Sequence, residues 1–216
     1  ADWQGKAFDP VTGTNLEFGV KRDWLKGKWN TSVSAYQITR NNVLTADLDH
    51  PNPSGGYYNR QSGQQQTKGV EVDIRGEVVS GIDILVNYAF TEAKVTKDSD
   101  PKNVGVQVPG SSKHIQNSWL NYKVQNGALA GFGVSLGYQW QLQRSSWYVF
   151  DGSDKSLPDY FRLDGGVSYQ KDKIGFNLFI NNILNKSLFS GSPYADYFYW
   201  QAEPGTNARF SINYRF

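Results

Sequence analysis

The sequence contains no cysteine, no methionine and only two histidines among its 216 residues. The lack of cysteine excludes disulfides, thiolate zinc sites and cysteine nucleophiles. Lysine and arginine (22) nearly balance aspartate and glutamate (20), which argues against a nucleic-acid partner. No apolar run approaches the ~18 residues of a membrane-spanning helix. Because an initiator methionine is also lacking, we expect the sequence to be processed or to be a piece of something longer.

Aromatic residues, in contrast, make up 15% of the chain, and apolar side chains alternate with polar ones over long stretches. Val70, Val72 and Ile74, for example, are separated by charged residues. Consecutive side chains of a strand point to opposite faces, so a period of two predicts strands with one apolar and one polar face. We expect little helix and about nine strands, at 12–25, 28–47, 64–79, 82–98, 111–124, 131–149, 157–170, 173–189 and 204–216.

The lengths of the expected strands and of their connections point to a membrane barrel. A tilted strand needs ~9–11 residues to cross a bilayer, and every expected strand reaches that length. Short turns on one side and long loops on the other are typical of outer-membrane barrels. We expect tight turns at 25–28, 80–81, 125–131 and 171–173, and long loops at roughly 48–63, 98–110, 150–157 and 190–203.

A soluble β-sandwich or barrel also shows alternation, because one face of its sheet packs on a core. Three features favour the membrane: a polar face that stays polar over long strands, aromatic residues near strand ends such as Trp24 and Trp29, and a final strand that ends in Phe216. Bacterial barrels have an even number of strands, and an open edge cannot lie in lipid. With nine strands, we therefore expect residues 1–216 to form part of a larger closed barrel.

Seven short motifs occur in a fixed order along the chain: 12–21 (TGTNLEFGVK), 38–43 (ITRNNV), 68–73 (KGVEVD), 87–95 (NYAFTEAKV), 157–164 (LPDYFRLD), 181–186 (NNILNK) and 214–216 (YRF). Together they resemble the C-terminal portion of the TonB-dependent ferric-siderophore receptors of the bacterial outer membrane. One departure is Asn185, where the family more often has aspartate, and another is the segment 205–209.

The resemblance implies an all-β transmembrane antiparallel barrel of 22 strands with an N-terminal plug domain, of which this chain forms the last nine strands. It implies a periplasmic C-terminus, extracellular long loops and TonB-dependent import of a ferric siderophore. Iron is expected only within the transported chelate, with no other cofactor. The implied partners are the siderophore, TonB through the absent plug, the remaining part of the same barrel, outer-membrane lipid and lipopolysaccharide, and the barrel assembly machinery.

No catalytic pattern is found, so we expect that the protein is not an enzyme. The sequence has no Ser-His-Asp arrangement in a strand–turn–helix context. Asp47, Asp49 and His50 lie close together, but their spacing does not match a calcium loop, and we expect a solvated loop there. His114 is isolated in the sequence.

The expected extracellular loops are dense in aromatic residues, which offer a siderophore stacking area and hydrogen-bond donors. Arg60 and Arg144 could add charge for an anionic chelate. An aromatic belt at the outer headgroups is the competing interpretation. The candidate ligand-binding residues are Tyr57, Tyr58, Trp147, Tyr148, Tyr197, Tyr199 and Trp200.

Two further sets of residues have expected roles in the barrel. One set forms the inward polar face, expected to contact the plug and lumen water: Glu71, Asp73, Arg75, Glu77, Arg162, Asp164, Arg209 and Arg215. The other resembles the C-terminal signal that outer-membrane assembly machinery recognises: Phe210, Ile212, Tyr214 and Phe216.

Three other functions remain open at this point. A passive pore or a small autonomous barrel would share the alternating strands. A haem or cobalamin receptor would share the barrel type, although two histidines give haem ligation little support. A soluble β-rich binding module, such as a lectin-like domain, would be soluble in water without detergent.

Overall fold

The computed structural model describes residues 1–146, 156–194 and 197–216, with the backbone alone for 192–194 and 197–199. The strands of this part are β1 (Thr12–Trp24), β2 (Trp29–Pro51), β3 (Tyr57–Val79), β4 (Ile82–Lys97), β5 (Ser112–Lys123), β6 (Phe132–Arg144), β7 (Tyr160–Lys171), β8 (Ile174–Asn181), β9 (Phe189–Tyr194), β10 (Tyr197–Ala202) and β11 (Asn207–Tyr214). Its helices are two 3-10 turns, η1 (Leu25–Gly27) and η2 (Pro101–Asn103). No helix in these residues is both long and apolar enough to cross a membrane.

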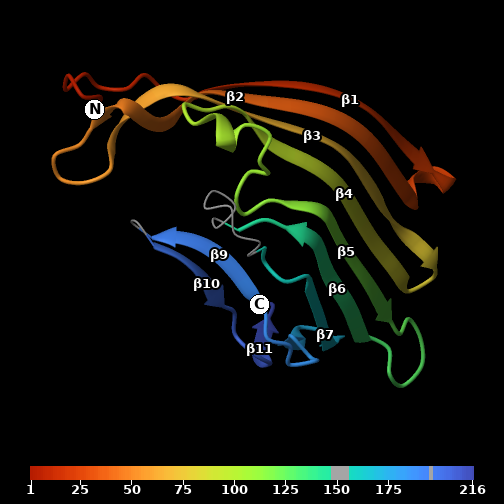
Figure 1. The fold of residues 1–216 in the computed structure, drawn as a ribbon. Helices are drawn as coiled ribbons and strands as arrows, with labels where there is room; N and C mark the ends of the chain where they lie inside the picture. The colour runs from red at the N-terminus through yellow and green to blue at the C-terminus, as the bar shows by residue number, and fades with distance from the viewer. Residues whose placement is uncertain (147–155, 195–196) are drawn as a thin grey trace.

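Nine of these strands form one antiparallel sheet, in the order β1-β2-β3-β4-β5-β6-β7-β8-β11. Each strand therefore lies beside its neighbour in the sequence until β8, which pairs with β11. The hairpin β9–β10 is a separate two-stranded sheet inserted between them. Figure 1 shows the nine strands bent into an open arc whose two edges are β1 and β11. The all-β class and the expected count of nine strands are confirmed.

Three expected boundaries were wrong. The loop expected at 48–63 is largely strand, because β2 reaches Pro51 and β3 begins at Tyr57. The strand expected at 173–189 ends at Asn181, and the loop expected at 190–203 contains the β9–β10 hairpin. The other expected strands agree to within a few residues, except that β6 ends at Arg144.

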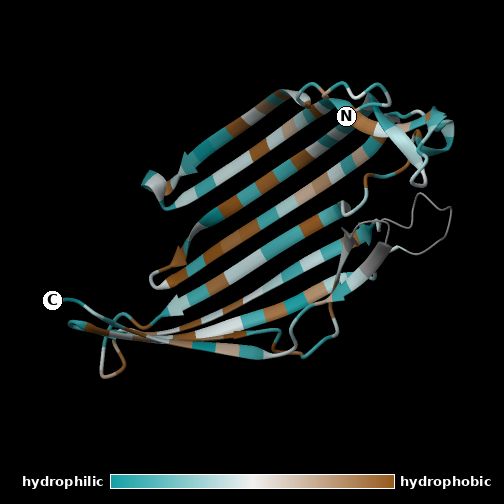
Figure 2. Cartoon of the chain, turned by 90° about the vertical axis from the view of Figure 1, so that its left-hand side faces the viewer, coloured by the Kyte–Doolittle hydropathy of each residue, from teal (hydrophilic) through white to brown (hydrophobic). Residues whose placement is uncertain are grey.

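The register of the sheet aligns apolar side chains into continuous rows on one face. In one row, Phe18 of β1 lies opposite Ala35, Ala35 opposite Val70, and Val70 opposite Phe90. These side chains are exposed, and Phe18 retains 77% of its accessible surface. Figure 2 shows apolar and polar residues alternating along several of the long strands. No second layer of the described chain covers this face, whereas in a β-sandwich a second sheet packs on it.

The opposite face carries a continuous row of polar side chains. Ser32 donates a hydrogen bond to Asp73 over 3.1 Å, and Asn87 donates to the same carboxylate from the next strand. The register extends this row over seven strands: Lys21, Ser32, Asp73, Asn87, Asn117, Gln139 and Arg162. Such a row is typical of a water-filled or plugged lumen.

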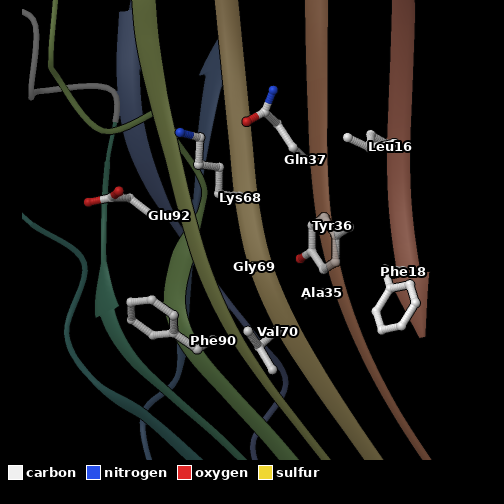
Figure 3. Close-up of a pocket in the computed structure, with 10 residues that line it drawn as sticks. All are labelled: Leu16, Phe18, Ala35, Tyr36, Gln37, Lys68, Gly69, Val70, Phe90 and Glu92. Atoms are coloured by element: carbon white, nitrogen blue, oxygen red, sulfur yellow. The ribbon is translucent and has the colours of Figure 1, made fainter. Parts of the chain in front are cut away.

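Aromatic rings cover several glycines within the strands, among them Gly69 and Gly137. The ring of Tyr36 lies over Gly69 (Figure 3) and reaches Thr91 two strands away, with 3.0 Å between the hydroxyl oxygens. The indole of Trp119 lies over Gly137, where an added Cβ would lie 2.3 Å from the ring. A side chain at either glycine would therefore displace the ring that packs there.

Candidate ligand-binding site at the loop end of the sheet

The long connections lie at one end of the sheet, and most of the buried apolar side chains lie there too. The tip of β2–β3 and the β9–β10 hairpin lie toward the same side in Figure 1, opposite the tight turns. In the rest of the sheet, a single layer leaves most apolar side chains exposed. The buried apolar residues of the described chain are Ala93, Val95, Leu157, Tyr160 and Leu188.

The connection between β4 and β5 folds back along β4. The amide of Val95 donates to Val106 O over 2.9 Å, and the amide of Val108 donates to Ala93 O over 2.9 Å. Beyond the end of β6, the hydroxyl of Ser145 donates to Val108 O over 2.6 Å. The expected loop at 98–110 is therefore held by backbone hydrogen bonds to its neighbours.

The base of the β9–β10 hairpin is attached to the start of β7. Tyr160 is buried, and its hydroxyl donates to a carboxylate oxygen of Glu203 over 2.9 Å. The amide of Glu203 donates to Leu188 O over 2.9 Å, which closes the hairpin base. Leu157 packs against Gly191 of β9. These contacts bring the β6–β7 connection and the hairpin together.

Asn182 is the most buried polar residue of this region, with 1% of its surface exposed. Its amide donates to a carboxylate oxygen of Asp164 over 2.8 Å, and its side-chain nitrogen donates to Lys186 O over 2.9 Å. Its side-chain oxygen accepts from the amide of Lys186 over 3.0 Å, and its carbonyl accepts from the hydroxyl of Thr206 over 2.7 Å. One residue therefore links β7, the end of β8 and the segment that leads into β11.

The backbone explains why asparagine is found here. Asn182 and Asn185 have φ of 52° and 48°, in the left-handed region that asparagine tolerates better than most residues. At Asn185, where the family more often has aspartate, the side-chain oxygen accepts from the amide of Thr206 over 3.0 Å. Sequence reasoning found the motif 181–186 but missed this role.

The expectation that Asp164 contacts lumen water was wrong. Asp164 is 4% exposed, and its carboxylate accepts from the amide of Asn182 and from Arg162 Nε over 2.9 Å. Burial of a charge is costly unless the charge is paired and hydrogen-bonded, and here it is both. Asp164 thus stabilises the hairpin base.

Neither arginine proposed for an anionic ligand is a free charge. Arg144 is 8% exposed, donates to Pro158 O over 3.0 Å and lies 5.2 Å from the centre of the Tyr160 ring. Arg60 Nη1 lies 3.3 Å from a carboxylate oxygen of Asp49 and 3.7 Å from one of Asp47. Both guanidinium groups therefore interact with other segments of the same chain.

The segment 47–50 is not the solvated loop that its sequence suggested. It lies at the end of β2, where Asp47 is 5% exposed and its carboxylate lies 2.9 Å from His50 Nδ1. The ring of Trp3 stacks on His50 with 4.1 Å between ring centres. Within the described residues, no group of three or more His, Cys, Asp or Glu is placed to hold a metal ion.

A family model described as "TonB dependent receptor-like, beta-barrel" matches residues 2–183 of the chain. The chain belongs to this family. The resemblance carried by the seven motifs is confirmed. The apolar face of the sheet is therefore the lipid-facing wall of an outer-membrane barrel of a TonB-dependent receptor.

Relatives of known function and structure agree with this assignment. The ferric-pyoverdine 358 receptor of Pseudomonas putida is 28% identical over 192 residues, which cover 88% of this chain and 23% of that protein. The metal-pseudopaline receptor CntO of Pseudomonas aeruginosa is 29% identical over 196 residues, covering 88% and 26%. FpvA of P. aeruginosa, solved with heterologous pyoverdines, superimposes with a TM-score of 0.74 at 26% identity, covering 99% and 28%. The chain thus spans about a quarter of the length of these receptors.

Tyr57 was interpreted either as a ligand contact or as part of an aromatic belt at the headgroups. Its distance from the apolar stripe of β3 bears on this choice. The apolar stripe on β3 ends at Val70 and gives way to Lys68 on the same face. Tyr57 precedes Val70 by 13 residues along β3, or roughly 40 Å at ~3.3 Å per residue. On a straight strand tilted by ~45°, this separation raises Tyr57 roughly 30 Å above Val70, which favours the ligand interpretation over a belt at the headgroups.

The structure places some of the candidate aromatic residues and leaves others undetermined. Tyr57 and Tyr58 begin β3 and are therefore strand residues, contrary to the expected loop; Tyr57 is 48% exposed. Trp200 lies on β10, is 40% exposed and contacts the ring of Phe189, with 6.0 Å between ring centres. The remaining candidates lie outside the described side chains: Trp147, Tyr148, Tyr197 and Tyr199.

Proposed function

We propose that this chain forms part of the barrel wall of an outer-membrane receptor that imports a ferric siderophore with energy delivered through TonB. The observation that carries the proposal is the nine-stranded sheet with an uncovered apolar face, in a chain that matches the TonB-dependent receptor barrel. The names of the relatives, which include receptors for ferric-pyoverdine and ferrioxamine B, support a siderophore as cargo.

The open edges support the view that further strands of the same barrel complete the wall. β1 and β11 are the edges of the sheet, and each presents unpaired backbone groups. Unpaired amides and carbonyls cost several kcal/mol each in hydrocarbon, so a stable barrel needs both edges paired. Those strands, a plug domain and TonB are the partners we propose within the whole receptor.

The final strand supports a role in recognition by the barrel assembly machinery. Phe210, Ile212 and Tyr214 lie on one face of β11 and keep more than half of their surface exposed (61%, 62% and 54%). Phe216 follows the strand and is fully exposed. A row of exposed apolar groups on an edge strand is accessible to a protein that adds a strand to it.

The chemistry of the loop end supports ligand binding without bond making. Trp200 and Tyr57 present exposed rings there, and both Arg144 and Arg60 are engaged with the chain itself. His50 is paired with Asp47, and His114 Nδ1 lies 2.9 Å from the Tyr88 hydroxyl on the lipid-facing side, so neither histidine supports haem ligation. We therefore propose that the protein is a receptor with iron as cargo.

Uptake of a radiolabelled ferric siderophore by cells that make the full-length receptor tests this function. We expect uptake to exceed that of cells without the receptor, and to stop when a protonophore collapses the inner-membrane gradient. Binding of the chelate to de-energised cells should persist. Uptake that continues in de-energised cells would instead establish a passive pore.

The aromatic candidates are tested by the double substitution Trp147→Ala and Trp200→Ala in the full-length receptor. Stacking of a ring on a chelate contributes ~0.5–1.5 kcal/mol, so losing two rings should weaken binding by about tenfold or more. Trp24→Ala is the matched control, because Trp24 is also exposed but lies at the tight-turn end of the sheet. Unchanged affinity of the double variant in a titration removes both residues from the site.

A further inference from the structure

The tight turn between β5 and β6 contains Asn126-Gly127, the only Asn-Gly pair in the sequence. Figure 1 shows this turn projecting beyond the ends of both strands. Its base is held by backbone hydrogen bonds: the amide of Val124 donates to Phe132 O over 2.8 Å, and the amide of Gly131 donates to Val124 O over 2.9 Å. Asn126 and Gly127 lie beyond this base and are exposed. The turn therefore combines fixed strand ends with an open tip.

Both groups needed for an attack within the chain are free at this pair. Within the residues that the structure describes, the backbone amide of Gly127 donates to no acceptor, and the side chain of Asn126 has no hydrogen-bond partner. Gly127 has φ of 85°, and a Cβ added to it would meet nothing within 4 Å. Because glycine has no Cβ, its backbone can approach a neighbouring group closely. The Gly127 nitrogen is therefore free to turn toward Asn126 Cγ.

Two other asparagines outside the strands show the opposite arrangement. The amide of Val104, which follows Asn103, donates to Pro101 O over 3.2 Å. The amide of Ile183, which follows Asn182, donates to a carbonyl of β7 over 2.8 Å. Attack by either nitrogen would first break a backbone hydrogen bond, and each of these nitrogens also carries a branched side chain beside it. The structure therefore separates Asn126 from these two asparagines.

We propose that Asn126 is a site of spontaneous deamidation, a modification that needs no enzyme. The Gly127 nitrogen loses its proton to a base in the solvent and forms a bond to Asn126 Cγ. The bond from Cγ to the side-chain nitrogen breaks, and ammonia leaves with a proton taken from the solvent. Water then opens the cyclic imide at one of its two carbonyl groups, which yields aspartate or isoaspartate. Either product replaces a neutral amide by a carboxylate.

The fixed base of the turn makes this modification compatible with the barrel. Isoaspartate adds one atom to the main chain, and the open tip accommodates that atom because the hydrogen bonds of Val124 and Gly131 lie outside the altered segment. The new carboxylate is exposed to water, so no charge is buried. We therefore expect the receptor to keep its fold while it gains negative charge as it ages. The inference holds whatever cargo the receptor imports.

Peptide mass spectrometry of the full-length receptor tests this site. The receptor is incubated in mildly alkaline buffer, either folded in detergent or unfolded in guanidinium chloride, and is then digested with trypsin. Cleavage after Lys123 and Arg144 releases a peptide in which Asn126 is the single asparagine. We expect two products with the mass gain of an amide-to-carboxylate change. Because no hydrogen bond has to break first, the rate in the folded receptor should lie within about threefold of the rate in the unfolded one.

The internal control is Asn103, which lies in a separate tryptic peptide, 103–113. We expect Asn103 to deamidate more slowly in the folded receptor than in the unfolded one, because the amide that follows it is hydrogen-bonded. Samples digested at the start of the incubation give the background formed during digestion, and heat modifiability in gels shows which samples are folded.

Two variants separate the chemistry from the exposure of the turn. Asn126→Ser has no side-chain amide and should give no product. Gly127→Ala keeps the amide but places a Cβ beside the attacking nitrogen, so it should lose most of the product. The proposal is overturned if the folded wild type forms no product at Asn126, or forms it more than about threefold more slowly than the unfolded receptor. Product formation in folded Gly127→Ala at the wild-type rate overturns it too.

Discussion

At the scale of single residues, buried polar side chains position the loop-end segments of this protein more than buried apolar side chains do. Asn182 is 1% exposed, and both its amide and its side chain are hydrogen-bonded to other segments. In a single-layered sheet there is little hydrophobic core to position a loop. Hydrogen bonds to a buried residue supply that positioning, because leaving any of the partners unpaired costs ~1–3 kcal/mol.

The substitution Asn182→Ala in the full-length receptor should therefore destabilise the hairpin base by ~2–4 kcal/mol. It removes the bonds to the Lys186 amide and carbonyl, and alanine tolerates the left-handed backbone less well. Thermal unfolding in detergent and limited proteolysis between β8 and β11 would detect the loss.

The neighbouring Asn181→Ala is the control for this prediction. The side chain of Asn181 makes an exposed bond to Asn207 over 2.9 Å, so its loss should cost no more than ~0.5 kcal/mol. Equal stability of the two variants would show that the buried hydrogen bonds do not hold the hairpin.

At the scale of strands, the alternating pattern predicted the sheet wherever one face meets lipid. Val70 to Val78 alternate with polar residues because the two faces of β3 meet different surroundings. The same strand continues through residues 57–67, where glutamine, serine and threonine occupy both faces. Without an apolar face there is no period of two, and residues 57–63 of the strand were assigned to a loop.

The end of β8 was missed for a different reason. Residues 181–186 continue to show apolar side chains, so the pattern alone extended the strand to residue 189. The strand ends because Asn182 takes a left-handed conformation and its carbonyl bonds to Thr206, 24 residues later. A contact between residues so far apart in the sequence cannot be predicted from the alternation of apolar and polar residues. For the same reason, Glu203 and Trp3 were not identified, although the aromatic candidates were found from composition.

At the scale of the whole molecule, the assignment depends on which medium covers the apolar face. The sheet is one layer thick over most of its area, and the side chains on this face remain exposed in the described chain. Exposed apolar area of this extent is unfavourable in water, because roughly 25 cal/mol is lost for each Å². Lipid removes that cost without a second protein layer.

Adjacent residues of β2 allow this assignment to be tested directly in the full-length receptor. Val33 lies in an apolar row between Val20 and Val72 and is 49% exposed, whereas Ser34 points to the polar face. An arginine on the lipid face costs ~2–4 kcal/mol near the bilayer midplane, but little on the lumen side. Val33→Arg should therefore lower the amount of folded, heat-modifiable barrel in the outer-membrane fraction, and Ser34→Arg should leave it near the wild-type level. If Val33→Arg assembles as well as Ser34→Arg, hydrocarbon does not cover this face.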